Sequence, residues 1–224
     1  MTRAMPDKQC TMQEAFEGIE DGATVMVGGF GNAGEPIALL EQLLSLGVRD
    51  LVIVANNGGS GEFGLARLLR HRRVRKLICS YPRTPGSTVA QELYAEGAIE
   101  LEVVPQGTLA ERIRAAGAGI GGFYTPTGAG TELTKGREQR IMNGRAHVLE
   151  LPLSADVALV KADRADPWGN LTYHLAARNF NPIMATAASL TIAQVREVVS
   201  LGEIPPEQVV TPSVYVDRIV ETGG

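Results

Sequence analysis

The chain has 224 residues, of which 44% are hydrophobic and 21% charged, and it carries a formal net charge of -4 at pH 7. This length and composition predict a globular protein with a full core, which we expect to be a single domain spanning residues 1–224. A mildly acidic chain disfavours nucleic acid and anionic membranes as partners. No apolar stretch approaches the ~18 residues that span a bilayer, and the N-terminal MTRAMPDKQC lacks the apolar core of a secretory signal, so we expect a cytoplasmic protein.

The residues that most often bind structural metals are few and scattered. The cysteines are Cys10 and Cys79, and the histidines are His71, His147 and His174. Their spacing forms neither a disulfide framework nor a thiolate metal site. We therefore expect no metal.

The first half of the sequence alternates between helical patterns and short apolar strands. Thr11 and Glu14 form a capping box, which predicts a helix over residues 11–20. A strand over 24–27 is followed by a helix that starts at Pro36 and ends at Gly47. Further strands are predicted over 51–55, 76–80 and 99–104, alternating with helices over 63–69, 88–95 and 108–116, the last opened by a second Thr-x-x-Glu. This order predicts an α/β fold with a mainly parallel central sheet and flanking helices.

The character of the sequence changes after residue 116. Residues 117–132 are too glycine-rich to predict a regular element, and Asn143-Gly144 then predicts a type I′ hairpin within residues 137–150. Further strands are predicted over 156–162, 171–173 and 190–195. We expect this C-terminal part to be more antiparallel and to close the sheet.

Residues 29–34, GFGNAG, match the G-x-G-x-x-G pattern of dinucleotide sites. Such a site also needs an acidic residue at the end of the second strand, where this chain has Asn56 and Asn57. Glu35 places negative charge where a pyrophosphate would bind, and Pro36 removes an amide donor there. A dinucleotide oxidoreductase is therefore disfavoured. The glycines either form a tight turn or let the backbone approach another ligand.

A longer pattern around these glycines resembles a known family. Residues 21–36, DGATVMVGGFGNAGEP, together with ANN at 55–57, VPQGTL at 104–109 and DPWGNLTY at 166–173, are similar to the A (alpha) subunit of the family I coenzyme A transferases. The resemblance extends over roughly residues 11–220 and implies the CoA-transferase fold. It also implies an enzyme that moves coenzyme A from an acyl-CoA to a free carboxylic acid. Coenzyme A and acyl-CoA would be substrates, with no permanently bound cofactor.

In this family the nucleophile is a glutamate carboxylate of the B (beta) subunit, which attacks the donor thioester and passes through a mixed anhydride to a glutamyl-CoA thioester. That glutamate lies in a Ser-Glu-Asn-Gly motif. The most similar stretch here is Ser60-Gly61-Glu62, in which Glu62 is one residue too far along and is more typical of a helix N-terminus. The resemblance therefore implies no catalytic residue in this chain and a B-subunit partner, in a heterodimer or A2B2 tetramer. The alternative from another class is a non-catalytic acyl-CoA-binding or assembly subunit.

The resemblance also implies which residues bind. The CoA-binding segment would be Gly28, Gly29, Phe30, Gly31, Asn32, Ala33 and Gly34, and the substrate contacts would be Asn56, Asn57, Tyr81, Arg83 and Gln106. Alternatives are an Asx-turn for the asparagines, a helix-entry role for the glutamine and plain solvent exposure for the arginine. A guanidinium suits the distal carboxylate of a dicarboxylic substrate.

Residues 56–62 and 80–83 look most like the branch of the family that acts on 3-oxoadipate with succinyl-CoA as donor, an activity of aromatic degradation. The acetoacetate or short-chain acid branch looks less close. The basic residues between Arg67 and Lys76 are expected to be solvated, and the sequence does not separate a structural from an interfacial role for Arg178 and Asn179.

Overall fold

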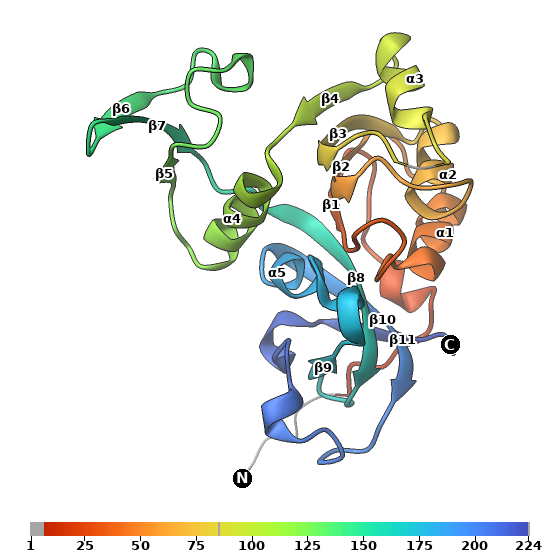
Figure 1. Ribbon diagram of the computed structural model, residues 1–224. Coiled ribbons are helices and arrows are strands. Elements are labelled where there is room, and N and C mark those ends of the chain that lie inside the picture. The colour runs from red at the N-terminus through yellow and green to blue at the C-terminus, as the bar shows by residue number, and fades with distance from the viewer. Residues whose placement is uncertain (1–6, 85, 224) are drawn as a thin grey trace.

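The computed structural model describes residues 7–84 and 86–223 and contains an eight-stranded sheet (Figure 1). Its strands follow the order β11-β10-β8-β1-β2-β3-β4, all parallel, with β9 antiparallel beside β8. The α/β class with a mainly parallel sheet is thereby confirmed. The strands are β1 Thr24–Val27, β2 Leu51–Asn57, β3 Val74–Tyr81, β4 Glu100–Val103, β8 Ala155–Ala165, β9 Leu171–Thr172, β10 Ala188–Val198 and β11 Arg218–Glu221.

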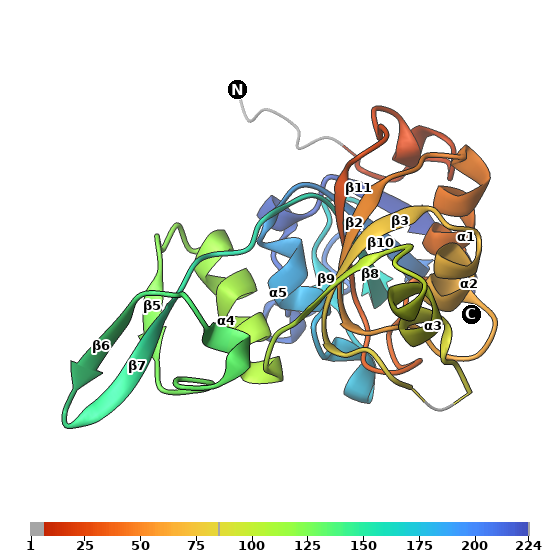
Figure 2. The ribbon, with the colours of Figure 1, turned by 90° about the horizontal axis from the view of Figure 1, so that it is seen from above.

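Helices cover both faces of this sheet (Figures 1 and 2). One face carries α1 Ile37–Leu46, α2 Gly64–Arg70 and α3 Val89–Ala95, and the other carries α4 Gln106–Gly117 and α5 Asn181–Ala185. Strand β2 is buried at every position, so its alternating side chains supply both cores. Ile53 packs with the residues of α1 to α3, and Val54 with those of α4 and α5. Short 3₁₀ turns are η1 Glu14–Phe16, η2 Glu132–Thr134, η3 Leu175–Arg178, η4 Pro206–Gln208 and η5 Ser213–Tyr215.

Strand β1 lies where the order of the sheet reverses, between β2 and β8. In α/β sheets the crevice outside the carboxyl ends of strands at such a point is where ligands bind. The register aligns Val27 with Ala55 and Leu159, and Ala55 with Cys79. The loops that follow β1, β2 and β3 therefore lie side by side at one edge of the sheet.

A small antiparallel sheet stands apart from the main one (Figures 1 and 2). Its strands, in the order β5-β7-β6, are β5 Phe123–Thr125, β6 Gln139–Met142 and β7 Arg145–Glu150. The predicted type I′ hairpin is confirmed, because Asn143 and Gly144 have φ values of 51° and 74°. The prediction of no regular element over 117–132 was wrong at β5, whose aromatic residues pair with β7.

Three other expectations are corrected. The capping box forms, with the Thr11 amide 2.8 Å from Glu14 Oε2, but it opens only the single 3₁₀ turn η1, since Gly18 (φ 85°) redirects the chain. Helix α4 begins at Gln106, so Thr108 lies buried inside it. The C-terminal strands β8, β10 and β11 are parallel; antiparallel pairing is confined to β9 and the small sheet. The connection through η3 and α5 is long enough to return β10 parallel to β8.

Across residues 7–84 and 86–223, none of the helices has the length and apolar character needed to cross a membrane.

Candidate functional site

The glycine loop, residues 28–34, connects β1 to α1 at the carboxyl edge of the sheet. Three of its glycines pack against this chain itself. A Cβ on Gly28 would lie 1.8 Å from Asn181 Oδ1, and one on Gly34 would lie 2.5 Å from the Ala177 carbonyl oxygen. A Cβ on Gly29 would be 3.2 Å from the backbone of Glu35. These glycines are therefore needed for close packing.

Two asparagines, one directly after η3 and one at the start of α5, hold the loop in place. Asn179 Oδ1 accepts a hydrogen bond from the Gly29 amide (3.2 Å), and its Nδ2 donates to the Ala33 carbonyl (2.9 Å). Asn181 Nδ2 donates to the Gly34 carbonyl at 3.1 Å. The role of Asn179 that the sequence left undecided is thus structural in this chain. Asn181, which is fully buried, was missed because its partners are about 150 residues away in sequence.

The exposed part of the loop is its tip. The backbones of Phe30 and Ala33 exchange hydrogen bonds of 3.0 and 3.2 Å, which closes a tight turn. Gly31, at φ +58°, has open space where its Cβ would be, and Phe30 is half exposed. Among the described residues, the Gly31 and Asn32 amides have no hydrogen-bond partner. Of the predicted segment, residues 30–33 are therefore the ones that can meet a ligand.

A cluster of polar side chains lies at the same edge, on the face of α4. Asn56, near the end of β2, accepts hydrogen bonds through Oδ1 from Ser80 Oγ (2.9 Å) and Gln106 Nε2 (2.7 Å). Gln106 is the first residue of α4 and directly follows the loop after β4. We call Asn56, Ser80 and Gln106 the amide cluster. The structure brings together two of the predicted residues and adds Ser80, whose signal was its place beside the predicted Tyr81.

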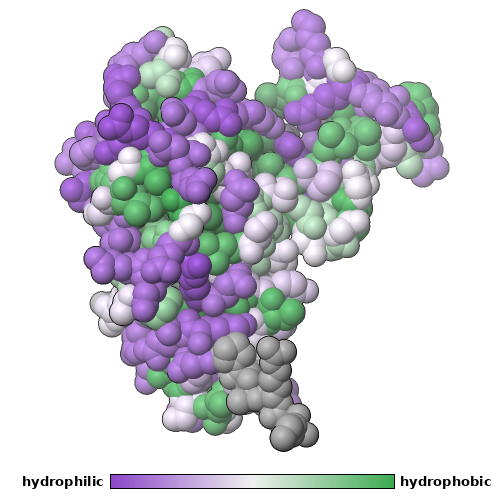
Figure 3. Space-filling view, turned by 180° about the vertical axis from the view of Figure 1, so that it is seen from behind, coloured by the Kyte–Doolittle hydropathy of each residue, from purple (hydrophilic) through white to green (hydrophobic). Residues whose placement is uncertain are grey.

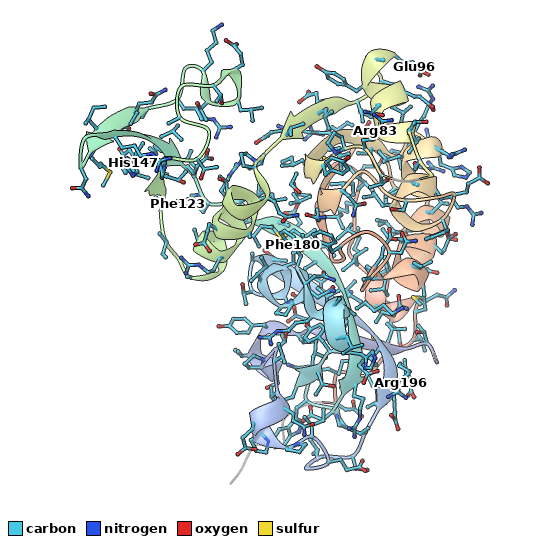
Figure 4. The ribbon with its side chains drawn as sticks, in the orientation of Figure 1. Arg83, Glu96, Phe123, His147, Phe180 and Arg196 are labelled. Carbon is cyan, nitrogen blue, oxygen red and sulfur yellow. The ribbon has the colours of Figure 1, made fainter. Side chains whose placement is uncertain are left out.

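The other predicted residues point to the opposite face of the sheet. Asn57 Oδ1 accepts a hydrogen bond from the Gly59 amide at 2.9 Å, which is the Asx-turn alternative. Tyr81 is paired in register with Asn57 and is 57% exposed. Arg83 lies in the loop between β3 and α3 (Figure 4). A cavity of about 450 Å³ is lined there by Arg70, Tyr81, Arg83, Thr84, Gly86, Ser87 and Thr88. We call it the β3–α3 cavity.

Glu35 directly follows the glycine loop and is buried beneath it, against the start of α2. It is 4% exposed, and its Oε1 accepts a hydrogen bond from the Leu65 amide at 3.0 Å, next to the start of α2. Its Oε2 is buried and has no partner among the described residues. Burial raises the pKa of Glu35, against the opposing effects of the Leu65 hydrogen bond and the Lys161 charge. Glu62, by contrast, is highly exposed and lies 3.5 Å from Arg70.

Hydrogen-bond donors therefore dominate the chemistry of this edge. Backbone amides at the loop tip and side-chain amides of the amide cluster suit an oxyanion or a carbonyl oxygen. Cys79 directly precedes Ser80 in β3, but it is buried, and burial raises the pKa of its thiol to about 12, so it is a poor nucleophile. Within the described residues, no three His, Cys, Asp or Glu side chains group to hold a metal.

The sequence was compared with protein families and with known relatives. A family model described as "Coenzyme A transferase" matches residues 10–222. The chain is 58% identical to the A subunit of 3-oxoadipate CoA-transferase from Pseudomonas putida, covering 96% of this chain and 93% of that one. It is 55% identical to the A subunit of 3-oxoadipate CoA-transferase from Acinetobacter baylyi, covering 96% and 95%.

Among solved structures, the chain is similar in fold to an acyl-CoA transferase from Escherichia coli O157:H7, with a TM-score of 0.83 at 22% identity. The alignment covers 97% of this chain but only 47% of that one, so the chain spans about half the length of that structural relative.

Proposed function

The chain belongs to the coenzyme A transferase family, and from that premise we propose that it is the A subunit of a heteromeric 3-oxoacid CoA-transferase. The observation that carries this proposal is the hydrogen bond between Asn56 and Gln106, made at the same edge as the free amides of the glycine loop. Amide groups from three separate segments, the glycine loop, β2 and α4, lie at this edge, and preorganised amide donors of this kind support the proposal because they suit an acyl oxyanion. We further propose that the chain is a single domain.

The geometry supports a division of labour between two subunits. Glu35 is buried beneath the glycine loop, and Glu62 points to solvent beside Arg70, so neither is placed to attack a thioester bound at the amide cluster. We propose that a partner subunit supplies the nucleophilic carboxylate, while this chain positions the acyl group and stabilises the oxyanion. Coenzyme A enters as a substrate along the exposed tip, residues 30–33.

Apolar surface on the small sheet supports the existence of a partner. Large apolar side chains are exposed on and beside this sheet, and Figure 3 shows hydrophobic residues gathered there and on the adjoining body. They include Leu133, Ile141, Met142 and Leu151. Contiguous exposed apolar surface is typical of an interface between subunits. We propose that the partner subunit covers it, in an AB or A2B2 assembly.

We propose 3-oxoadipate as acceptor and succinyl-CoA as donor. The support is the name of the two relatives described above and the presence of Arg83, a cation that suits a second carboxylate, beside Tyr81. Acetoacetate or a short-chain acid is the alternative acceptor.

Reconstitution tests the proposal. The chain is purified alone and together with a candidate B subunit that carries Ser-Glu-Asn-Gly, and CoA transfer from succinyl-CoA is measured with 3-oxoadipate, acetoacetate and acetate. We expect no transfer by either chain alone and transfer to 3-oxoadipate by the pair. Full activity of this chain in isolation contradicts the division of labour. Acyl-CoA binding without turnover with every B-type partner favours a non-catalytic role.

A further inference from the structure

The β3–α3 cavity has a built interior rather than being a shallow gap between loops. A Cβ on Gly58 would lie 2.4 Å from the Pro82 carbonyl oxygen, so the loops after β2 and β3 are in close contact. The Thr84 hydroxyl donates to the Gly59 carbonyl and ties the same two loops together. The Ser87 amide donates to the Thr84 carbonyl at 3.2 Å, which fixes the approach to α3. The cavity is therefore held open by this chain's own packing.

One polar group inside the cavity lacks a partner. Ser87 is 6% exposed, and its Oγ is buried with no hydrogen-bond partner among the described residues. Buried polar atoms are almost always hydrogen-bonded, and leaving one unpaired costs about 1–3 kcal/mol. Ser87 lines the cavity, so a rotation of its side chain about χ1 would bring the hydroxyl to an acceptor oxygen of a ligand and supply the missing partner.

An exposed cation without a counter-charge also lines the cavity. Arg83 forms no ion pair with any carboxylate in the described part of the chain, whereas Arg70 lies 3.5 Å from Glu62. The Thr88 hydroxyl is already donating to Glu92 Oε1, at 2.5 Å. Among the residues that the structure describes, the lining side-chain donors without a partner are thus the Arg83 guanidinium, the Ser87 hydroxyl and the Tyr81 hydroxyl. A fork-shaped cation beside a hydroxyl matches a carboxylate.

The cavity adjoins the amide cluster through consecutive residues of one strand. Ser80 belongs to the amide cluster and Tyr81 lines the cavity, and successive side chains of β3 point to opposite faces of the sheet. Their Cα atoms are only ~3.8 Å apart. An acyl chain whose reacting carboxyl lies at the amide cluster can therefore cross the end of β3 and place its far end in the cavity.

We propose that the β3–α3 cavity binds the terminal carboxylate of a dicarboxylic acyl group, and that Arg83 and Ser87 determine this specificity. This inference rests on the proposed function and deepens it, since it assigns acyl selectivity to this chain rather than to its partner. A phosphate of coenzyme A carries the same anionic chemistry, and the experiment separates the two sources.

The test compares two acceptors that differ only in the terminal carboxylate, 3-oxoadipate and 3-oxohexanoate, in the assembled enzyme. In a double-displacement reaction, kcat/KM for an acceptor reports that acceptor's own half-reaction, so the donor can be kept constant. We expect Arg83→Ala to lower kcat/KM for 3-oxoadipate about 100-fold and Ser87→Ala to lower it about 10-fold. Both variants should keep kcat/KM for 3-oxohexanoate within about twofold of the wild-type value. Arg83→Lys should recover part of the kcat/KM that Arg83→Ala loses with 3-oxoadipate. Arg75→Ala, an exposed arginine near the start of β3, is the matched control.

Ser87→Ala separates specificity from structure. Removing an unpaired buried hydroxyl should not destabilise the fold, so a loss confined to the dicarboxylate reports a ligand contact. Equal losses with both acceptors, or no loss with either, overturn the inference. The inference is also overturned if Arg83→Ala leaves the preference between the two acceptors unchanged but removes the preference for coenzyme A over dephospho-coenzyme A. In that case the cavity would hold a phosphate of coenzyme A.

A binding measurement keeps the inference distinct from the proposed function. Calorimetric titration of the assembled protein with adipate and hexanoate needs no turnover. If no CoA transfer occurs but adipate binds, hexanoate does not, and Arg83→Ala abolishes adipate binding, the proposed function fails and the carboxylate site stands. Absence of adipate binding to the wild type overturns the site.

Discussion

Glu35 shows how one residue can serve two loops at once. Its backbone is the contact that excludes a Cβ at Gly29, and its carboxylate accepts the Leu65 amide next to the start of α2. A Cβ on Gly64 would lie 2.6 Å from Glu35 Oε1, so the carboxyl group fits closely against this turn. Burying a carboxyl group with one oxygen unpaired is costly for its charged form. Its protonation state therefore matters for stability.

We predict that Glu35 makes the protein less stable as pH rises. The folded-state pKa is raised above 4.5, so the folded protein holds this proton over a range in which the unfolded chain has lost it. The free energy of unfolding then falls as pH rises from about 4.5 through the raised pKa. Glu35→Gln, which cannot ionise, should remove this fall and be more stabilising, relative to the wild type, at pH 8 than at pH 4. Urea unfolding at both pH values measures it.

Glu20→Gln controls for the loss of one negative charge, because Glu20 is exposed. A Glu35→Gln effect that is the same at pH 4 and pH 8 would contradict the assignment of a buried ionisable carboxyl.

At the scale of elements, the glycine loop combines a fixed base with an open tip. The base is held by Asn179 and Asn181, and close contacts exclude a side chain at Gly28 and Gly34. The tip at Gly31 meets nothing within 4 Å. One motif thus contains glycines required for packing and a glycine that leaves space for a ligand.

Two alanine substitutions should separate these roles. Gly31→Ala faces only the strain of a positive φ and should cost about 1 kcal/mol of unfolding free energy. Gly34→Ala adds a clash with the Ala177 carbonyl and Asn181, and should cost about 3 kcal/mol. Denaturant unfolding gives both values.

In the assembled enzyme Gly31→Val should lower kcat/KM for succinyl-CoA; unchanged kinetics would show that the tip does not meet substrate.

Elements with strong local signals were predictable. The all-apolar run of β2, the helix α1 with its left-handed C-cap Gly47, and the Asn143-Gly144 hairpin are each specified by neighbouring residues. The predicted helix over 11–20 failed although its capping box formed and Ala15, Phe16 and Ile19 pack in the core, because Gly18 at φ 85° turns the chain after one 3₁₀ turn. A capping box favours the start of a helix but does not determine its length.

The candidate site was predictable only where neighbouring residues in the sequence specify it. That Asn56 and Gln106 lie close together was predictable because the ends of parallel strands meet at one edge. Asn57, expected to contact substrate, has its side-chain oxygen in an Asx-turn, and its contact with substrate stays a prediction. Ser80, Ser87 and Asn181 carry no distinctive local pattern, and their importance depends on residues brought close only by folding.

At the scale of the whole molecule, Arg112 of α4 connects the small sheet to the main one. Its guanidinium lies 3.0 Å from Glu102 of β4 and 3.8 Å from Glu150 of β7, and it donates to the Leu151 carbonyl at 2.9 Å. Glu150 is almost fully buried and also pairs with Arg137 at 2.5 Å. Burial raises the pKa of Glu102, but hydrogen bonds from Lys76 and Arg112 outweigh it and lower that pKa. Buried charges of this kind depend on their partners.

We predict that Arg112→Ala destabilises the protein by about 2 kcal/mol, since it removes the pair with Glu102 and the hydrogen bond to the Leu151 carbonyl, and leaves buried Glu150 with Arg137 alone. Arg114→Ala, on the same helix, removes only an exposed pair with Glu111 and should cost no more than about 0.5 kcal/mol. Urea unfolding followed by Trp168 fluorescence and by far-ultraviolet circular dichroism measures both. In the wild type the two signals should coincide; separate transitions would contradict the single-domain proposal.

The sequence by itself determined the α/β class, the parallel sheet and the family, because these depend on local periodicity, turn residues and motifs contiguous in the chain. Tertiary structure decided the rest. It placed all of the antiparallel strands except β9 in a separate sheet, and assigned three glycines of the loop to packing against Asn181, Ala177 and Glu35. It also formed the β3–α3 cavity with Ser87 unpaired inside it. Contacts between residues distant in sequence depend on how the layers pack, and a single sequence does not record that packing.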